Sequence, residues 1–252
     1  DIGLTIEFKD VSFTYQGRRS PALRNISFKL PPGEKLAVIG HNGSGKSTLV
    51  KLLAKYYQPH SGKIYVNDVD LEDIDTEWWR RQISYLVQEV PKYYMSFSEN
   101  IELGDYISKP NKDSLDTAIK SAELEADVED LPKGKETMLG KFFAGGVDLS
   151  GGQWQKLAIA RSLYGQSKVL ILDEPTSAID AATEQKILHN VFTKMKSQTA
   201  LIISHKFSNI KLADQIIVLE KGEIVEHGSH SDLMELAGVY SKLYKLQSEA
   251  FR

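Results

Sequence analysis

The sequence contains no cysteine, which excludes disulfide bridges, thiolate metal sites and a cysteine nucleophile. It has no run approaching about 18 consecutive apolar residues, so we expect no membrane-spanning helix within it. Positive charge is not in excess either, because 31 Lys and Arg stand against 34 Asp and Glu, a net charge of −3. A chain without a positive field lacks the main attraction for a nucleic-acid backbone. We therefore expect no nucleic-acid partner.

What the sequence does contain is the composition of an ordinary globular protein. Its 252 residues are 41% hydrophobic and 26% charged, and this length allows a sizeable buried core. The chain begins with Asp1 rather than Met, which we interpret as a segment taken from a longer protein.

Hydrophobic patterning predicts a mixed α/β fold. The first thirty residues alternate apolar and polar side chains, which predicts half-buried antiparallel strands that end at the Pro31-Pro32-Gly33 turn. Short apolar strands alternating with helices are typical of a parallel sheet covered on both faces. These predicted strands are residues 35–39, 169–172, 200–203 and 215–219.

Helix signals are concentrated between these strands, at residues 76–164. They are an N-cap at Asp75 or Thr76, a helix over 115–126 and a helix that begins after Ser150. A further amphipathic helix is predicted over 231–247, and a hairpin turn at Lys221-Gly222. The helix after the 35–39 strand is predicted to carry Leu49, Leu52, Leu53 and Tyr56 on one stripe.

Residues 40–47, GHNGSGKS, match the phosphate-loop pattern GxxxxGK(S/T) between a predicted strand and a predicted helix. The glycines let backbone N–H groups turn inward toward an anion, and the helix N-terminus adds partial positive charge. In such a loop Lys46 reaches the β- and γ-phosphates, Ser47 ligates Mg²⁺ and Thr48 adds a hydroxyl. The candidate nucleotide-binding residues here are Gly40, Asn42, Gly43, Ser44, Gly45, Lys46, Ser47 and Thr48.

Two acids, Asp173 and Glu174, follow the apolar strand at 169–172. They would lie at the carboxyl edge of the sheet, where open α/β sheets bind ligands. Since adjacent strand residues face opposite ways, we expect Asp173 in the Mg²⁺ shell and Glu174 turned toward a water as general base. The alternative is a helix N-cap after a strand.

Residues 149–153, Leu-Ser-Gly-Gly-Gln, place a second anion-binding helix start in the same chain. Alone, the pentamer would more often be a capped helix start. Here the chain resembles the nucleotide-binding domain of ATP-binding cassette (ABC) transporters, because the pentamer matches that family's signature motif in full. The phosphate loop, signature and acid pair also occur in the family's order, and the resemblance covers roughly residues 6–247.

This resemblance implies a P-loop NTPase (RecA-like) α/β core with a mostly parallel sheet, an N-terminal antiparallel β subdomain and an inserted α-helical subdomain. The core and antiparallel parts would be about 1–83 and 165–252, and the helical subdomain about 84–164. It also implies ATP as ligand, Mg²⁺ as cofactor, and a head-to-tail pair in which one chain's signature faces the other's phosphate loop.

Individual roles are likewise implied by the resemblance. Tyr15 would stack on adenine, although a strand tyrosine packed on the core is the alternative; Gln88 would touch Mg²⁺ and relay nucleotide state to a membrane partner. His205 would contact the γ-phosphate, whereas His60, His189 and His230 are interpreted as solvated surface groups. The residues that would bind across the dimer are Ser150, Gly151, Gly152, Gln153 and Asp180, the last in a loop with Ile179 where Leu is more usual.

Residues 97–101, 222–230 and 238–240 are similar to exporter cassettes, in which a transmembrane domain usually precedes the cassette. The implied function is ATP-driven export, with the chain on the cytoplasmic side of a membrane, paired with a second cassette, identical or not. Ala144 departs from the pattern, because exporters commonly place a glutamate there to touch the transmembrane domain. Aromatic residues at 93–97 either cover the core or form a socket for a helix of that domain.

The sequence also bears on three other functional classes. A cassette ATPase acting on nucleic acid or ribosomes is disfavoured, because only about 100 residues separate Ser47 from Leu149, too few for a long coiled coil, and only one cassette is present. The Trp78-Trp79-Arg80-Arg81 run is better explained by an amphipathic helix than by a nucleic-acid patch. A kinase or GTPase would leave residues 149–153 unexplained, and Glu174 argues against a nonhydrolytic scaffold.

Overall fold

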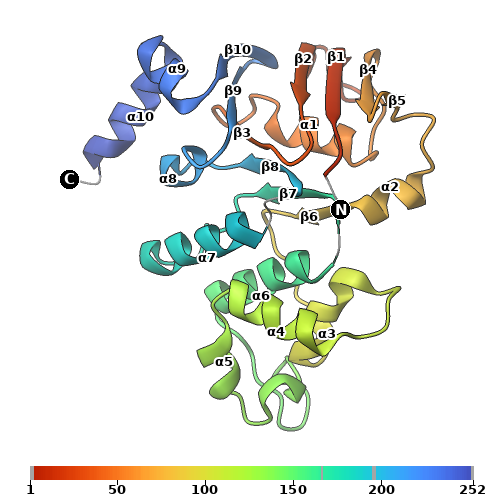
Figure 1. The fold of residues 1–252 in the computed structure, drawn as a ribbon, viewed down its shortest axis with the longest axis vertical. Helices are drawn as coiled ribbons and strands as arrows, with labels where there is room; N and C mark the ends of the chain where they lie inside the picture. Colours follow the sequence, from red (N-terminus) through yellow and green to blue (C-terminus); the bar gives the residue numbers. More distant parts are fainter. Residues whose placement is uncertain (1–2, 166, 195–196, 251–252) are drawn as a thin grey trace. The chain divides into compact units, whose positions relative to one another are not determined.

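The computed structural model describes residues 3–165, 167–194 and 197–250 (Figure 1). The chain divides into two compact units. The first unit comprises residues 1–83, 168–173 and 197–252, and the second comprises residues 84–167 and 174–196. The predicted division into a core of 1–83 and 165–252 and a helical subdomain of 84–164 stays a prediction.

An antiparallel sheet forms one layer of the first unit. Its strand order is β2-β1-β4-β5, with β1 spanning Ile6–Phe13, β2 Leu23–Leu30, β4 Ser61–Val66 and β5 Val69–Asp70. Successive side chains of a strand point to opposite faces of the sheet, so every second residue of β1 and β2 can face the core. Phe8 and Phe28, for example, face each other in register and stack with ring centroids 4.7 Å apart. The predicted antiparallel strands of the first thirty residues are confirmed.

The second layer is a mostly parallel sheet. Its central strand β3 (Lys35–Ile39) lies between β8 (Thr199–Ile203) and β9 (Gln215–Glu220), and β7 (Val169–Asp173) pairs with β8, all in parallel. Strand β10 (Glu223–Gly228) returns antiparallel to β9 after a turn at Lys221 and Gly222, as predicted. The strands β7 and β8 are buried throughout, which explains their unbroken apolar sequences.

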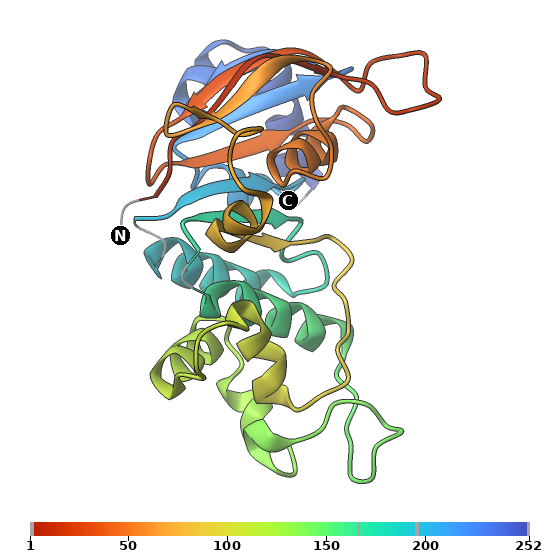
Figure 2. The same cartoon turned by 90° about the vertical axis from the view of Figure 1, so that its right-hand side faces the viewer.

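Helix α1 (Lys46–Leu53) follows β3 and lies between the two layers of strands (Figure 2). Tyr56 was expected on its buried stripe, and this prediction is wrong. The helix ends at Leu53, Lys55 adopts a left-handed conformation with φ of 55°, and the Tyr56 side chain is 57% exposed. The turn therefore points the Tyr56 ring away from the core.

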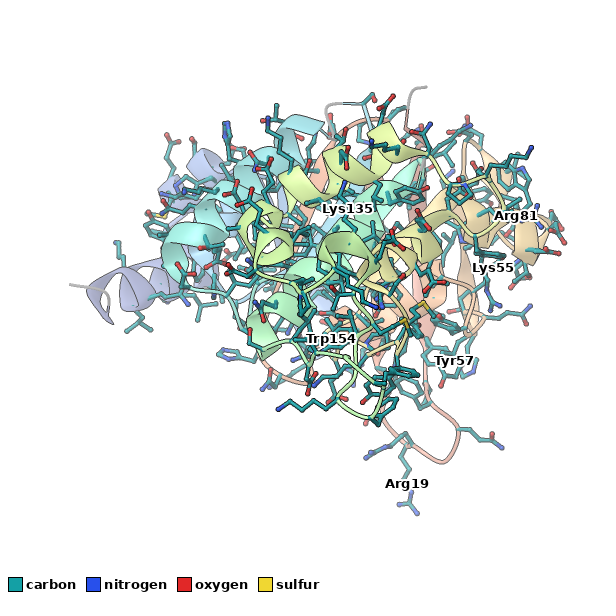
Figure 3. The ribbon with its side chains drawn as sticks, turned by 90° about the horizontal axis from the view of Figure 1, so that it is seen from below. Arg19, Lys55, Tyr57, Arg81, Lys135 and Trp154 are labelled. Atoms are coloured by element: carbon teal, nitrogen blue, oxygen red, sulfur yellow. The ribbon has the colours of Figure 1, made fainter. Side chains whose placement is uncertain are left out.

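Helix α2 (Thr76–Gln82) is capped by Asp75, whose Oδ1 accepts from the Trp78 backbone N–H at 2.7 Å. Trp79 is fully buried and its Nε1 donates to the Leu53 carbonyl at 2.7 Å, whereas Trp78 is 46% exposed. Arg81, labelled in Figure 3, is exposed and pairs with Glu77 one turn earlier. The amphipathic-helix interpretation of this run is confirmed.

The predicted single helix over 231–247 is two helices, α9 (His230–Glu235) and α10 (Val239–Ala250). Ala237 between them has a φ of 53°, which no α-helix accommodates. The short α8 (Phe207–Ile210) precedes β9 in the same unit. His230 is not a solvated surface group, because its Nδ1 lies 2.6 Å from the buried Tyr240 hydroxyl; His60 and His189 are exposed as expected.

The second unit is mainly helical, and the chain enters it within β6 (Ile83–Leu86). Its central helix is α6 (Gly151–Tyr164), against which α3 (Phe97–Glu102) and α4 (Lys112–Ser121) pack. The predicted helix over 115–126 is wrong in its end: α4 stops at Ser121, and Glu123, with φ of 53°, separates it from α5. The other elements here are α3 (Phe97–Glu102), η1 (Leu103–Asp105), α4 (Lys112–Ser121), α5 (Glu125–Glu129), η2 (Gly134–Glu136) and α7 (Ala181–Lys194).

Helix α7 joins this unit through polar contacts with the end of α4. The Asn190 amide donates to Glu123 Oε1 at 2.9 Å and lies 3.5 Å from the Ser121 carbonyl. Across the part of the chain that the structure describes, no helix has both the length and the apolar character that crossing a bilayer requires.

Candidate functional site

In the first unit, the carboxyl ends of three neighbouring parallel strands meet at one edge. Val38 of β3 is in register with Ile203 of β8, which is in register with Asp173 of β7. The segments that leave this edge are the loop from Gly40 to Gly45 and the segment at Ser204 and His205. The topology therefore brings the predicted phosphate loop, Asp173 and His205 to a common edge.

The loop from Gly40 to Gly45 has a backbone that glycine alone tolerates at two positions. Gly40 has a φ of 151° and Gly45 a φ of 113°, both outside the range that L side chains readily adopt. A Cβ atom on Gly40 would lie 2.2 Å from the Leu219 carbonyl oxygen, and one on Gly45 would lie 2.6 Å from Leu23 Cδ2. The glycines of the motif are therefore required by the fold of the loop itself.

Two buried polar groups point to an anionic ligand at this loop. The Lys46 ammonium donates to the carbonyl oxygens of Gly40 at 2.7 Å and His41 at 3.1 Å, which holds it against the loop. The Ser44 hydroxyl is buried and has no hydrogen-bond partner among the described residues. A buried hydroxyl without a partner is costly unless a ligand supplies one. Gly45 is the N-cap of α1 and makes no side-chain capping bond, and the first N–H groups of a helix have no partner within the helix.

Tyr15 lies beside this loop rather than in the core. Its hydroxyl is 3.2 Å from Thr48 Oγ1, and its half-buried ring makes edge contacts with Phe13 and Tyr57 at 4.9 and 5.3 Å. Ser47 is exposed, as are His41, Asn42 and Gly43 at the tip of the loop. Figure 3 labels Tyr57 and, on the loop between β1 and β2, the projecting side chain of Arg19.

Asp173 and His205 differ in exposure. Asp173 closes β7 and is only 5% exposed, whereas the His205 side chain is exposed one residue beyond the buried Ser204. No group of three or more His, Asp and Glu that could hold a metal occurs among the described residues. A Mg²⁺ ion that takes a hydroxyl, one carboxylate and phosphate oxygens requires no such group.

The signature pentamer lies in the second unit and starts α6. Ser150 is the N-cap: its Oγ accepts from the Gln153 N–H at 3.2 Å, and Gln153 Oε1 accepts from the Ser150 N–H at 2.8 Å. This reciprocal capping box leaves Ser150 and Gly151 exposed at the helix start. Gly152 is needed for a close approach, since a Cβ there would lie 3.0 Å from the Ala178 carbonyl oxygen.

Glu174 does not continue the strand, so the expectation based on strand alternation is wrong. Strand β7 ends at Asp173, and Glu174 has a φ of 49°, a left-handed conformation that is rare for glutamate. The two carboxylates are separated by this turn rather than by the pleat of a strand. Such outliers cluster at functional sites, because the surrounding structure must hold them.

Gln155 is the residue that holds the loop after Glu174, and sequence reasoning did not identify it. Its Nε2 donates to the Glu174 carbonyl at 3.2 Å and to Ser177 Oγ at 3.0 Å, and its Oε1 accepts from the Ala178 N–H at 2.7 Å. The available signal was an amide on the apolar face of α6, in line with Ala158 and Ile159. A polar residue buried at such a position needs partners.

Asp180 ends this loop and caps α7. Its Oδ1 accepts from the backbone N–H groups of Thr183 at 3.0 Å and Ala182 at 3.1 Å. The hydrogen bond from the Thr183 N–H is the main reason that the pKa of this carboxyl lies below its usual value. Ile179 is buried, which suits a residue that replaces leucine there.

Gln88 is exposed in the bend after β6, and the aromatic residues that follow it divide into two groups. Phe97 is fully buried in α3, whereas Tyr93 and Tyr94 are 40% and 50% exposed. The Tyr94 ring meets that of Phe142 edge to face at 4.7 Å, and Phe142 is 68% exposed. Phe97 therefore belongs to the core, as one interpretation of this stretch expected, and Tyr94 lies at the surface. The socket for a helix of a transmembrane domain stays a prediction.

Comparison with known proteins identifies the family. The family described as ABC transporter matches residues 23–177, which carry the phosphate loop, the signature and the acid pair. The chain belongs to the ABC transporter family. It is 42% identical over 242 residues to the uncharacterized ABC transporter ATP-binding protein YfiB of Bacillus subtilis, covering 96% of this chain and 41% of that protein.

Other relatives of this ABC chain are transport proteins by name. It is 40% identical over 242 residues to the ATP-dependent lipid A-core flippase of Mannheimia succiniciproducens, covering 96% of the chain and 41% of the flippase. Among solved structures, a bacterial Atm1-family ABC exporter with ATP bound superposes with a TM-score of 0.90 at 32% identity, over 98% of this chain and 42% of that one. The predicted resemblance and fold class, an exporter-type ABC nucleotide-binding domain on a P-loop fold, are confirmed. The chain spans about 40% of the length of these relatives.

Proposed function

We propose that this chain is the ATP-binding and ATP-hydrolysing motor of an ABC exporter. The observation that carries the proposal is the phosphate loop at the sheet edge. There the Lys46 ammonium is buried and the buried Ser44 hydroxyl has no hydrogen-bond partner among the described residues. Asp173 ends β7 at the same edge, and His205 follows the end of β8. This combination binds a triphosphate and leaves acidic and basic groups beside it.

The nucleotide would be held by residues of the first unit. Gly40, Asn42, Gly43, Ser44, Gly45, Lys46 and Thr48 would surround the phosphates, and the half-buried Tyr15 ring would stack on the adenine. Ser47 and Asp173 fit a Mg²⁺ ion, because an exposed hydroxyl and a carboxylate at the same sheet edge are oxygen ligands that it prefers. Gln88 would complete the ligand set. When bound, such an ion would neutralise phosphate charge during the reaction.

Hydrolysis would be carried out by Glu174, His205, Lys46 and Gln88. Glu174 would accept a proton from the attacking water, and the water oxygen then bonds to the γ-phosphorus as the bridging bond to ADP breaks. Lys46 and His205 would stabilise charge on the transferred phosphoryl group. The left-handed backbone at Glu174, secured by Gln155, supports a carboxylate held in one direction.

A second copy or a related cassette would complete each site. Ser150, Gly151, Gly152 and Gln153 form an exposed helix start in the second unit, and one triphosphate needs only one such start from each chain. We propose that this signature binds the γ-phosphate held by the partner chain. Asp180 would lie where the loop before α7 meets the partner chain. ATP would bind the closed pair more tightly than the open pair, because only the closed pair contacts the γ-phosphate from both chains. Once the γ-phosphate is lost, this preference disappears and the pair reopens.

The export function is supported by the names of the relatives, an exporter and lipid A-core flippases. Since the chain spans about 40% of their length, its partner would be a transmembrane domain of the same transporter, with the cassette at the cytoplasmic side of the membrane. Opening and closing of the cassette pair would drive that domain.

The test is MgATP hydrolysis by the chain and by two variants. Glu174→Gln should lower kcat by about 10²- to 10⁴-fold and leave ATP binding intact, because only the proton acceptor is removed. Lys46→Ala should instead weaken ATP binding, because it removes a positive charge from the phosphate loop. Glu235→Gln, an exposed glutamate on α9, is the matched control and should keep the parental rate. Parental turnover by Glu174→Gln would refute the assigned base.

A further inference from the structure

The last helix of the first unit holds the segment that carries His205. Gln247 of α10 bonds the two consecutive peptide groups that follow His205. Its Nε2 donates to the His205 carbonyl oxygen at 2.7 Å, and its Oε1 accepts from the Phe207 N–H at 2.9 Å. Only this orientation of the amide satisfies both groups, because the reverse would place donor against donor and acceptor against acceptor.

Aromatic packing next to Gln247 fixes the same segment. The Phe207 ring contacts Tyr240 and Tyr244 of α10 edge to face, at centroid distances of 5.4 and 5.5 Å. Tyr240 is fully buried in a cluster with Ile210 and Leu233. The side of α10 that bears Gln247 therefore covers α8 and the chain leading into it.

The start of α10 is anchored to strand β10, which makes the helix a defined support. Glu226 is 9% exposed, and its carboxylate accepts from the N–H groups of Val239 and Tyr240, the latter at 2.9 Å. The Tyr240 hydroxyl is bonded in turn to His230 Nδ1 at 2.6 Å. Gln247 is thus presented to His205 from a helix that is fixed at its other end.

Gln247 also faces the phosphate loop across one groove. The groove has a volume of about 770 Å³ and is bounded by the loop at Gly40 to Asn42, by Ser204 and His205, and by Leu243 and Gln247 of α10. The residues that bound it thus come from the phosphate loop, the His205 segment and α10.

We propose that Gln247 is a positioning residue for ATP hydrolysis, which sets the direction of the His205 side chain by fixing the two peptide groups after it. The inference rests on the proposed function, in which His205 contacts the γ-phosphate. The Lys206 N–H also donates to Ser204 Oγ at 3.0 Å, so this segment keeps one anchor when Gln247 is replaced. Without the two hydrogen bonds from Gln247 the segment is held less firmly, and the exposed imidazole is directed toward the phosphate for only part of the time. Catalysis is sensitive to such loss of orientation.

The experiment compares Gln247→Leu, which removes both hydrogen bonds at nearly constant size, with His205→Ala and the double variant. Gln247→Leu should lower kcat about five- to tenfold and change KM for MgATP less than twofold. In the double variant the loss should equal that of His205→Ala alone, because the two residues act through one side chain. Gln185→Leu, an exposed glutamine on α7, is the matched control and should keep the parental kcat.

A second readout does not depend on turnover. Hydrogen exchange at the Phe207 amide should accelerate about tenfold in Gln247→Leu and stay slow in Gln247→Glu, which retains the acceptor for that N–H. A parental kcat in Gln247→Leu, or losses that multiply in the double variant, would overturn the proposal. If the unsubstituted chain fails to hydrolyse ATP, the proposed function has failed. If exchange at the Phe207 amide is unchanged in Gln247→Leu, the hydrogen bonds from Gln247 do not hold this segment and the proposal is wrong.

Discussion

At the scale of single residues, the polar groups of the site divide into those that the protein satisfies itself and those left for a ligand. Gln155 uses both ends of its amide on the loop after Glu174, and Gln153 closes a capping box with Ser150. Ser44, equally buried, has no such partner among the described residues. In the proposed function, Gln155 organises the loop after Glu174 and Ser44 would bind the nucleotide.

Gln155→Leu tests this division. It leaves the Ala178 N–H and the Glu174 carbonyl without their buried partner, so we expect a loss of about 2 kcal/mol in the free energy of unfolding. The kcat for ATP should fall with it, since Glu174 loses its support. Urea unfolding and steady-state ATPase assays measure the two effects. A variant as stable and as active as the parent would show that the loop holds its conformation without Gln155.

Residues whose function depends on a local motif were predictable from the sequence. The strand, glycine loop and helix around Lys46 follow from spacing and turn chemistry, and β7 with its terminal Asp173 follows from an apolar run. The turn at Glu174 was not predictable, because its left-handed backbone depends on Gln155, which is distant in sequence. The same holds for Gln247, whose two bonds span about forty residues.

At the scale of elements, prediction failed where a helix ends without a glycine or proline. Lys55, Glu123 and Ala237 all adopt positive φ at helix ends, although none is a residue that favours it. The break between α9 and α10 has a cause in the fold. The Glu226 carboxylate accepts hydrogen bonds from the Val239 and Tyr240 N–H groups, which in a continuous helix would donate to carbonyl groups one turn earlier. Tertiary capping thus overrides the amphipathic pattern.

The packing of α10 predicts a pH dependence. Burial, with a contribution from Tyr244, raises the pKa of Tyr240 to about 12, above the value of about 10 expected in the unfolded chain. The stability that this contributes is fully present below pH 10 and is lost as the pH rises from 10 toward 12, because the unfolded chain releases the proton first. Urea unfolding between pH 8 and 11 should show a shallower decline in Tyr240→Phe, which also loses the hydrogen bond to His230 at every pH.

The control for this series is Tyr106→Phe, because Tyr106 is 74% exposed and its ring adds little to the core. Its decline in stability should follow that of the parent. Equal slopes for the parent and Tyr240→Phe would mean that Tyr240 titrates alike in the folded and unfolded chain.

At the scale of the whole molecule, the chain carries two helix starts suited to phosphate in two different compact units. One is α1 behind the phosphate loop, and the other is α6 behind Ser150. The proposed function gives each of them a role, the first on the nucleotide of the same chain and the second on the nucleotide of the partner chain. The proposed function therefore requires two cassettes for each pair of nucleotides, with each γ-phosphate contacting the phosphate loop of one chain and the signature of the other.

The most direct test of that requirement is the mass of Glu174→Gln in solution with MgATP, measured by light scattering after size-exclusion chromatography. We predict the mass of two chains with MgATP and of one chain with MgADP, because only the triphosphate joins phosphate loop to signature. Adding Ser150→Arg should return the MgATP sample to one chain. A Glu174→Gln protein that binds MgATP yet keeps the mass of one chain at every attainable concentration would contradict the account.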